Sequence, residues 1–326
     1  MKAWQIHEAG EAAAVYRLVN LESPRPGRGQ VRVRVLGAAV NYPDVMMARG
    51  QYQVQPPYPY TPGVELCGEV IELGAETVGV ALGDRLIGTA DLPAGAFAEE
   101  ALMNAGLAQP APPALDDAEA AGVHIAYQTG WFGLHRRAHL QRGETLLVHA
   151  AAGGVGSAAV QIGKAAGARV IGVVGGADKA RIAADLGCDV VLDRTVDELV
   201  PAIKEATNGR GVDVVYDPVG GDAYAASART IAFEGRIIIV GFASGAIPSP
   251  ALNHALIKNY SILGLHWGLY NAMDPAAITA AATEITALMA AGVRPLVSER
   301  LPLEQAPAAV TAVGAGRSTG RIVLLP

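Results

Sequence analysis

The segment from Glu144 to Ser157 contains the residues whose types and spacing point most directly to chemistry. Thr145 to His149 is a short apolar, β-branched run, which is typical of a buried parallel strand. The run leads into Ala151-x-Gly153-x-x-Gly156, and a helical pattern begins at Ser157. In a strand–turn–helix unit, Gly153 lets the backbone approach a pyrophosphate and Gly156 lets the helix pack close to the strand. The segment therefore predicts a dinucleotide-binding site.

The helix N-terminus in this unit offers unpaired N–H groups and a partial positive charge to phosphates. We expect the cofactor contacts to come from Ala152, Gly153, Gly154 and Val155. Ala151 stands where such a fingerprint has its first glycine. A tight turn of small residues without a ligand is the alternative interpretation.

The end of the next predicted strand favours NADPH over NADH. A protein that reads NADH places Asp or Glu there to hold the ribose hydroxyls, whereas this strand ends Val173-Val-Gly-Gly176. Lys179 follows in the next helix, and Arg194 follows the third strand. Cations suit a 2′-phosphate, so we expect Gly175, Lys179 and Arg194 to surround it. A solvated Lys179 in the first helical turn is the alternative.

The elements that must position these residues alternate between strands and alanine-rich helices from about residue 124 onward. Such alternation predicts an α/β fold with a doubly wound parallel sheet. Further strands are expected at Arg169–Val174, Asp189–Asp193, Val212–Tyr216, Arg236–Val240 and Tyr260–Leu265. Helices are expected at Ala126–Leu140, Lys179–Leu186, Val196–Thr207, Ala223–Phe233 and Pro275–Ala291.

The first 110 residues or so have a different pattern, with short strands separated by glycines and prolines. Gln30 to Leu36 alternates between apolar and polar residues, as a half-buried strand does. Pro43 to Arg49 suits one short helix, with Asp44 as a first-turn carboxylate. This pattern predicts a small all-β barrel, and the strand–helix–strand tail at Val297–Leu325 is expected to fold back onto it.

Length and composition limit the possible classes. A chain of 326 residues suggests two domains. The net charge of −6 gives no sign of the basic surface that binds nucleic acid. No apolar run is long enough to span a membrane, and the first residues lack the apolar core of a signal peptide. With only two cysteines, Cys67 and Cys188, no disulfide framework is expected. We expect a protein of the cytoplasm.

Seven motifs occur in the order and spacing of one known family. Besides the Ala151–Gly156 turn they are Asn41-Tyr-Pro-Asp44, Gly50-Gln-Tyr52, Pro62-Gly-Val-Glu65, Tyr216-Asp-Pro-Val-Gly-Gly221, Val240-Gly-Phe242 and Gly320-Arg-Ile-Val-Leu324. Together they resemble the zinc-independent quinone oxidoreductase branch, similar to zeta-crystallin, of the medium-chain dehydrogenase/reductase superfamily. The resemblance covers nearly the whole chain.

The resemblance implies a GroES-like catalytic domain and a Rossmann domain with NADP(H) bound in the cleft between them. It implies a catalytic domain at residues 1–123, a Rossmann domain at 124–286 and a returning segment at 287–326. It also implies a homodimer or homotetramer. Glu65, in the family's Pro-Gly-x-Glu turn, is expected to be structural. For Arg321, contact with the cofactor and a surface position both remain open.

Further site residues are carried over from matching positions of the family. Asn41 matches a family residue near the nicotinamide, and Thr129 matches a threonine near the cofactor. Gly241, Phe242 and Ser244 follow the fifth predicted strand, where ligands gather at strand carboxyl ends, so their backbone is expected to hold the carboxamide. For Asn41 and Thr129, a side chain that satisfies its own backbone is the alternative.

The substrate pocket is expected to include Tyr52, Tyr58 and Trp267. Tyr52 matches the tyrosine that enoyl thioester reductases carry, where it is thought to donate a proton to the reduced substrate. A phenol can also stabilise a developing enolate oxygen. We expect Tyr52 and Asn41 to be catalytic, with a packed loop aromatic as the alternative for Tyr52.

No zinc is expected. Zinc-dependent relatives carry His where this chain has Val64, and Cys within the segment where it has Asn41–Asp44. His135 and His139 are spaced i, i+4, but two ligands do not make a zinc site. Cys67 is expected to be a small core residue, as free cysteines commonly are.

The expected lack of metal restricts the reaction. Oxidising an alcohol removes a proton with a pKa of about 16, and a metal can lower such a value by roughly 9 units. That corresponds to about 12 kcal/mol, which few side chains could replace. Reducing a quinone instead forms a phenolate-like anion with a conjugate acid pKa near 10, so roughly 8 kcal/mol less stabilisation is needed. Metal-free reduction of a conjugated acceptor is favoured.

The sequence therefore predicts an NADPH-dependent quinone oxidoreductase that transfers hydride to a quinone or a related α,β-unsaturated carbonyl. The alternative is an enoyl thioester reductase acting on a short-chain enoyl-CoA such as acryloyl-CoA. A different class, a non-catalytic NADPH-binding or RNA-associated crystallin-like protein, also remains open. The acidic composition disfavours its RNA-associated form.

Overall fold

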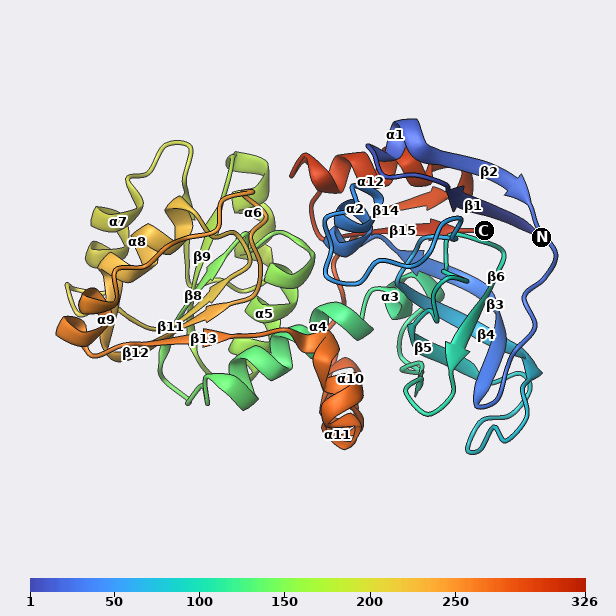
Figure 1. The fold of residues 1–326 in the computed structure, drawn as a ribbon. Helices are drawn as coiled ribbons and strands as arrows, with labels where there is room; N and C mark the ends of the chain where they lie inside the picture. The colour runs from blue at the N-terminus through green and yellow to red at the C-terminus, as the bar shows by residue number, and fades with distance from the viewer. The chain divides into compact units, whose positions relative to one another are not determined.

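The structure, a computed structural model, describes residues 1–326 (Figure 1). The contacts between residues divide the chain into two compact units. The first unit combines Met1–Ile125 with Asp274–Pro326, and the second is the continuous segment Ala126–Met273. Each unit is built around its own sheet.

The second unit contains a six-stranded sheet in which every pair of neighbouring strands is parallel. Its strands are β8 (Thr145–His149), β9 (Arg169–Val174), β10 (Val190–Asp193), β11 (Val212–Asp217), β12 (Ile231–Ile239) and β13 (Ser261–Gly264). The spatial order is β10-β9-β8-β11-β12-β13. This is the order of a dinucleotide-binding fold, whose ligands bind where the order reverses, between the carboxyl ends of β8 and β11.

Helices cover both faces of this sheet, α5 and α6 on one and α7 and α8 on the other (Figure 1). They are α5 (Gly154–Ala165), α6 (Ala177–Asp185), α7 (Leu199–Ala206), α8 (Asp222–Thr230) and α9 (Leu252–Lys258). Their apolar faces enclose a core that includes Leu147, Ile171 and Ile237. Burial on both faces explains the continuously apolar sequences of the central strands. The expected doubly wound α/β fold is confirmed.

Two expected helices end differently in the structure. The helix predicted at Ala126–Leu140 is α4 (His124–Trp131), which continues as a π-helix, η1 (Phe132–Arg137). The helix predicted through Phe233 ends at Thr230, so that prediction was wrong at its C-terminal end. Ile231 is already extended and buried because β12 begins there, and a bulge interrupts the register between β11 and β12. Two short helices, η2 (Trp267–Leu269) and α10 (Tyr270–Met273), follow β13.

The first unit contains a seven-stranded sheet with the order β14-β15-β3-β4-β5-β7, and β6 pairs with β3. These strands are β3 (Gln30–Ala39), β4 (Glu65–Leu73), β5 (Arg85–Thr89), β6 (Glu100–Asn104), β7 (Gln109–Pro110), β14 (Val297–Pro302) and β15 (Arg321–Leu325). A separate hairpin is formed by β1 (Lys2–Ile6) and β2 (Tyr16–Asn20). The tail completes this unit, because β15 pairs with β3 in the register Val323↔Ala39.

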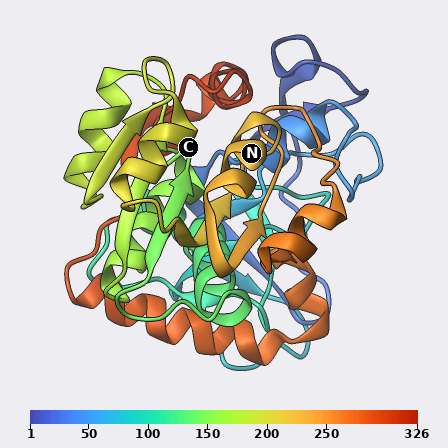
Figure 2. The same cartoon turned by 90° about the vertical axis from the view of Figure 1, so that its left-hand side faces the viewer.

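The helices of the first unit are short, with one exception. They are α1 (Ala12–Val15), α2 (Tyr42–Ala48), α3 (Asp117–Ala121), η3 (Leu303–Gln305), α11 (Pro275–Ala290) and α12 (Ala306–Gly314). The exception is α11, with 16 residues (Figure 2). Asp274 caps its N-terminus by accepting a hydrogen bond from the Ala277 N–H, and Pro275 occupies its first turn. None of the helices has both the length and the apolar character needed to cross a membrane.

Candidate functional site

The glycine turn after β8 has the geometry that a pyrophosphate site needs. A Cβ on Gly156 would lie 2.1 Å from the Ala150 carbonyl oxygen, so only glycine fits where α5 passes the turn. Ala150 itself has a left-handed backbone, with φ of +51°. Gly153 is the N-cap of α5, and no side chain caps that end of the helix. The N–H groups of the first turn, which begins with Gly154 and Val155, therefore remain available to an anion.

Two cations meet beside the carboxyl end of β9. A Cβ on Gly175 would lie 3.0 Å from a guanidinium nitrogen of Arg194, so Arg194 lies directly against this glycine. Burial and the charge of Arg194 together lower the pKa of Lys179. Because each of these charges disfavours the other, an anion bound beside them would stabilise both. The predicted group of Gly175, Lys179 and Arg194 is therefore brought together.

A carboxylate also stands near this corner, on the neighbouring strand. Asp193, the last residue of β10, accepts hydrogen bonds from the Gly176 N–H at 2.8 Å and from Thr195. Those bonds from Gly176 and Thr195 lower the pKa of Asp193. The Oδ1 atom of Asp193 is thus engaged by Gly176 and Thr195, and these bonds fix the turn that follows Gly175.

Beneath the glycine turn lies a buried polar group that sequence reasoning did not identify. The Nε2 atom of His149 lies 2.8 Å from the Ser227 hydroxyl oxygen. Because that hydroxyl donates to the Ala223 carbonyl, the imidazole must donate from Nε2. Burial lowers the pKa of His149, and the nearby charge of Asp217 opposes the change. His149 thus links the end of β8 to α8.

Asp217 organises the loop that follows β11. Its Oδ1 atom accepts hydrogen bonds from the N–H groups of Val219 at 2.8 Å and Gly220 at 2.9 Å. Its backbone carbonyl accepts from the Val240 N–H, which connects this loop to the end of β12. His149 and Asp217 therefore lie at the carboxyl ends of the two strands between which the strand order reverses.

The predicted cofactor residues Gly241, Phe242 and Ser244 lie on the loop after β12. That loop is joined to the loop after β11, since the Ser244 hydroxyl donates to the Val219 carbonyl at 2.7 Å. Phe242 packs against Gly220, where a Cβ would approach its ring to 2.9 Å. The segment is therefore held in one conformation beside the crevice. Contact of these residues with a cofactor stays a prediction.

In the first unit, Asn41 belongs to a fully buried polar network. Its side-chain amide donates to the Ala39 carbonyl and to Glu65, and its Oδ1 atom accepts from Arg321 at 3.0 Å. Arg321 is also ion-paired with Glu65, which in turn accepts from the Ile125 N–H at 2.6 Å. The predicted structural role of Glu65 is confirmed. The surface position left open for Arg321 was wrong, because its side chain is only 5% exposed.

Asp44 is the N3 residue of α2, and its Oδ2 atom accepts from the Asn41 N–H at 2.8 Å. The predicted role as a first-turn carboxylate is confirmed. The side chain is nevertheless buried, and burial raises the pKa of Asp44 to about 7 despite opposing backbone hydrogen bonds and the charge of Arg321. Its charge acts on Tyr52, whose own pKa is raised by burial first and by Asp44 second.

The remaining predicted pocket residues differ in exposure. Tyr52 is partly buried and Tyr58 is exposed, with the Tyr58 ring 5.7 Å from that of buried Tyr60. Thr129 is buried in α4, and Trp267 is buried at the start of η2. Roles for these residues in binding stay predictions.

The two histidines and the cysteine that were considered for metal binding lie in separate parts of the structure. His135 lies in η1 with its ring 5.9 Å from Trp131, and His139 lies beyond the helix with φ of +50°. Cys67 is fully buried in β4, as expected of a core residue, and burial raises its pKa to about 12. No group of three His, Cys, Asp or Glu side chains is arranged to hold a metal ion.

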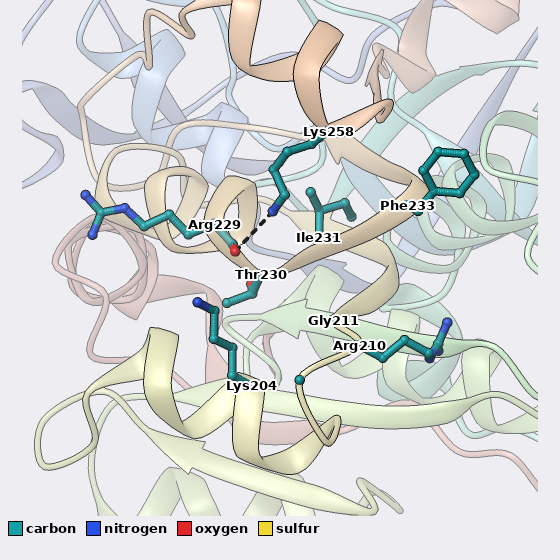
Figure 3. Close-up of a pocket in the computed structure, with 9 residues that line it drawn as sticks. Lys204, Arg210, Gly211, Arg229, Thr230, Ile231, Phe233 and Lys258 are labelled. Carbon is teal, nitrogen blue, oxygen red and sulfur yellow. Dashed lines mark hydrogen bonds between the residues drawn. The ribbon is translucent and has the colours of Figure 1, made fainter.

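A basic cavity of about 330 Å³ lies elsewhere in the second unit (Figure 3). It is lined by Lys204, Gly209, Arg210, Gly211, Arg229, Thr230, Ile231, Phe233 and Lys258. Lys204, Arg229 and Lys258 each stand in the last turn of a helix, where a cation stabilises the C-terminal carbonyls. Lys258 donates to the carbonyls of Ala228 and Arg229, both at 3.1 Å. Because Gly211 and Ile231 lie where strands begin, this cavity is at the opposite edge from the ligand crevice.

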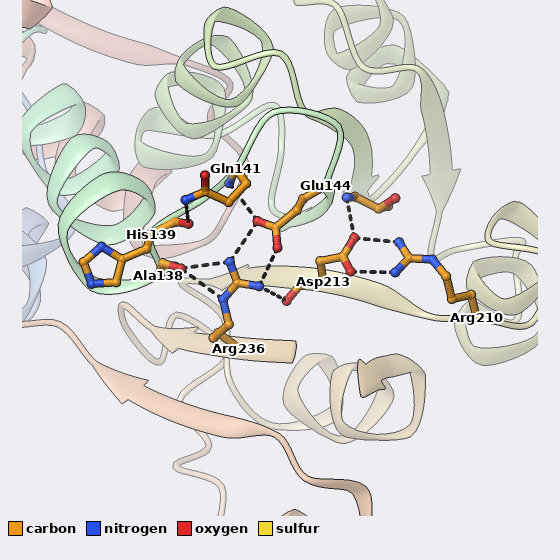
Figure 4. A network of polar contacts seen from close by, with 8 residues as sticks. Ala138, His139, Gln141, Glu144, Arg210, Asp213 and Arg236 are labelled. Carbon is orange, nitrogen blue, oxygen red and sulfur yellow. Dashed lines mark hydrogen bonds and ion pairs between the residues drawn. The ribbon is translucent and has the colours of Figure 1, made fainter. Parts of the chain in front are cut away.

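A polar network at the same edge fixes the start of β8 (Figure 4). Arg236 makes two hydrogen bonds of 2.8 Å to Glu144 and also donates to the Ala138 carbonyl. Asp213 accepts from the Thr145 N–H and pairs with Arg210. Burial raises the pKa of Asp213, but Arg210 and Thr145 outweigh it and lower the value. This network aligns β8 with β11 and β12.

The fold and these groups can now be compared with known proteins. The family described as Alcohol dehydrogenase GroES-like domain matches residues 27–113, and the family described as Zinc-binding dehydrogenase matches residues 154–283. Quinone oxidoreductase-like protein 2 of Mus musculus is 35% identical over 305 residues, which cover 93% of this chain and 87% of that protein.

Solved structures of oxidoreductases show the same similarity. Escherichia coli quinone oxidoreductase complexed with NADPH has a TM-score of 0.92 at 29% identity, with 100% of both chains covered. A probable oxidoreductase from Mycobacterium abscessus has a TM-score of 0.89 at 36% identity, covering 100% of this chain and 99% of that one.

These relationships define the class as an oxidoreductase with a GroES-like domain and a doubly wound nucleotide-binding domain. Within that class, the chain belongs to the quinone oxidoreductases of the medium-chain dehydrogenase/reductase superfamily. The family resemblance seen in the sequence is thereby confirmed.

Proposed function

We propose that this protein is an NADPH-dependent, zinc-independent reductase that transfers hydride to a quinone or a related α,β-unsaturated carbonyl. The observation that carries the proposal is the guanidinium of Arg194 against Gly175 at the carboxyl end of β9, with Lys179 close enough for the charge of Arg194 to lower its pKa. Two adjacent cations at this corner match a 2′-phosphate, which NADH lacks. The solved complex of Escherichia coli quinone oxidoreductase with NADPH supports the choice.

The residues present fit the cofactor. The uncapped start of α5 would hold the pyrophosphate through backbone N–H groups, and Gly156 keeps that helix close to β8. Lys179 and Arg194 would hold the 2′-phosphate. We place the nicotinamide end near Thr129, Gly241 and Phe242. When bound, NADPH supplies the hydride.

Zinc independence is supported by the chemistry of the side chains. Val64 is apolar, and the Asn41–Asp44 segment directs its polar atoms at Glu65, Arg321 and its own backbone. The chain then has to stabilise a delocalised enolate or phenolate rather than an alkoxide. A hydrogen-bond donor such as the Tyr52 hydroxyl is suited to that smaller demand.

A single panel tests the proposal. NADPH oxidation would be followed at 340 nm with naphthoquinone, an alkenal and acryloyl-CoA, each with and without a strong zinc chelator. We expect turnover with at least one acceptor and no effect of the chelator. Turnover confined to acryloyl-CoA would establish the enoyl thioester reductase instead. NADPH binding without turnover of any acceptor would indicate a non-catalytic binding protein.

We also propose that two copies of the chain associate through the β13 edge. β13 pairs only with β12, so its other side is open. Nearby α9 exposes Leu252, Leu256 and Ile257 by 74%, 76% and 71%. Open strand edges and exposed apolar patches invite pairing, and a two-fold axis would cover both at once. Light scattering should report a dimer, or a tetramer built from it, and Leu256→Glu with Ile257→Glu should give monomers.

A further inference from the structure

The basic cavity of the second unit lies where strands of its sheet begin, and it has no part in the proposed function. Gly211 immediately precedes β11, and Ile231 is the first residue of β12. NADPH is expected at the carboxyl ends of the strands, and the 6 residues of β11 separate its two ends by roughly 17 Å. The volume of about 330 Å³ is at the lower end of the range of small-molecule sites, roughly 300–1,000 Å³. The cavity is therefore large enough for a ligand of its own.

The lining of this cavity carries positive charge without a compensating carboxylate. Four of its nine residues are Lys or Arg, and none is Asp or Glu. Only Arg210 among the four is ion-paired, with Asp213 outside the lining. Lys204 and Arg229 stand in the last turns of α7 and α8, and their side chains make neither a hydrogen bond nor an ion pair. In a chain with a net charge of −6, this local excess of cations points to an anionic ligand.

A role at the ends of helices accounts for only one of these cations. Lys258 donates to the carbonyls of Ala228 and Arg229, so two of its three ammonium N–H groups cap α8 and one is left for another acceptor. Lys204 makes no such bond. Burial first and the charge of Lys204 second lower the pKa of Lys258. Because the charge of Lys204 disfavours that of Lys258, an anion bound beside both would stabilise both charged forms.

The arrangement of the lining side chains gives an anion a definite place (Figure 3). Lys204 comes from α7 and Lys258 from α9, and the two side chains approach Thr230 from opposite sides. Arg229, next to Thr230, is exposed and extends outward. Since its guanidinium has no partner, it is free to turn toward an anion held by the two lysines. The positive end of the cavity is thus built from the ends of three helices.

Another part of the lining is apolar. Ile231 is buried, whereas Phe233, two residues further along β12, is 71% exposed. An inorganic anion would leave this aromatic ring in water. A ligand that carries both a negative group and a flat ring would cover it, because aromatic rings pack favourably on one another. The combination of unpaired cations with an exposed phenyl ring therefore favours an aromatic phosphate ester over a simple ion.

We propose that the basic cavity binds a small phosphate monoester that carries an aromatic ring, with the phosphate between Lys204 and Lys258 and the ring on Phe233. Such a phosphate has a charge of about −1.5 to −2 near pH 7 and three strong acceptor oxygens. Those oxygens match the unused donors of the two lysines and of Arg229. The ligand is held without covalent chemistry, and the site is separate from the one proposed for NADPH.

Calorimetric titration of the full chain with phenyl phosphate tests the proposal. The protein is first saturated with NADPH, so that the probe cannot bind at Lys179 and Arg194. We expect one phenyl phosphate per chain. Inorganic phosphate should bind about two- to tenfold more weakly, because it lacks the ring, and phenol should not bind measurably. Absence of phenyl phosphate binding by the wild type would overturn the proposal.

Three variants locate the binding in the cavity. Lys204→Ala should weaken phenyl phosphate and inorganic phosphate alike, by about ten- to a hundredfold, without endangering the fold because Lys204 has no partner. Arg181→Ala removes the same charge from an exposed helix of the same unit and should change neither affinity. Phe233→Ala should reduce phenyl phosphate binding to the level of inorganic phosphate. Equal losses in Lys204→Ala and Arg181→Ala would overturn the site, and an unchanged affinity in Phe233→Ala would overturn the placement of the ring.

Discussion

At the scale of single residues, the choice between two cofactors depends on a few charges at the end of β9. Burial first and the charge of Arg194 second lower the pKa of Lys179, so the two cations repel one another in the free protein. A dianionic phosphate between them would relieve that repulsion and add charge-assisted hydrogen bonds. The group of Gly175, Lys179 and Arg194 therefore favours a phosphorylated ribose for two reasons. The phosphate relieves the repulsion between the two cations, and it also makes new contacts with them.

Lys179→Ala should weaken NADPH binding by roughly five- to a hundredfold and leave NADH binding nearly unchanged. Quenching of tryptophan fluorescence would give both dissociation constants. Arg181→Ala is a matched control, since Arg181 lies on the same helix and is paired with Asp178. Equal losses for NADPH and NADH in the Lys179 variant would contradict the assignment.

The same site gives a pH dependence with a definite sign. Because the pKa of Lys179 is lowered in the free protein, part of its charge is lost at a lower pH than usual. NADPH binds the charged form, so its affinity should fall as pH rises through that lowered pKa. The NADPH/NADH affinity ratio, measured across the alkaline range, should decline in the wild type and stay constant in Lys179→Ala.

Tyr52 offers a separate prediction about proton donation. Tyr52→Phe should lower kcat for an alkenal or acryloyl-CoA by roughly a hundredfold or more, the usual contribution of a positioned acid. Quinone turnover should be nearly preserved. Val54→Ala, in the same loop and 57% exposed, is the control and should keep both activities. Full turnover of the enoyl substrate by Tyr52→Phe would show that Tyr52 is not the proton donor.

At the scale of elements, the approach of α5 to the turn after β8 decides whether the crevice forms. Gly156→Ala would place a Cβ 2.1 Å from the Ala150 carbonyl, so the helix must shift. We expect a loss of about 1–3 kcal/mol of stability together with weaker NADPH binding. Gly264→Ala on β13 is the control, because a Cβ there meets nothing within 4 Å. Thermal unfolding and NADPH titration of both variants would measure the difference.

Elements with strong periodicity could be predicted from sequence, and irregular ones could not. β8 and β9 have the predicted limits because their central residues are apolar and a turn that contains glycine follows each of them. The end of α8 was missed because Ile231, Ala232 and Phe233 suit a helix as well as a strand. Only pairing with β11, made possible by a bulge, settles that β12 begins at Ile231.

The candidate site was predictable where backbone geometry dictates residue type, as at Gly153, Gly156 and Gly175. Side chains that act through contacts between distant segments of the chain could not be predicted from the sequence. Sequence alone could not show that Asp44 is buried and that its charge acts on Tyr16 and Tyr60, or that His149 hydrogen-bonds Ser227. The closest available signal was a polar residue, His149, ending an apolar strand immediately before the glycine turn.

At the scale of the whole molecule, the buried network of Asn41, Glu65 and Arg321 joins segments from both ends of the chain. Arg321→Met would remove the only cation beside the fully buried Glu65, at a cost of about 3–5 kcal/mol. Burial already raises the pKa of Glu65, and loss of Arg321 would raise it further. The variant's deficit in stability should therefore shrink as pH falls and Glu65 takes up a proton, which urea unfolding at several pH values would measure. A deficit that is the same at every pH would contradict this account.

Because β15 completes the sheet of the first unit only after the whole second unit has been made, the two halves become able to fold at different moments of synthesis on the ribosome. The nucleotide-binding half emerges in one stretch, while the other half must wait for its last strand. A stalled or clipped chain lacking that strand would keep a foldable dinucleotide module beside an unfinished partner. Such fragments would bind cofactor yet catalyse nothing.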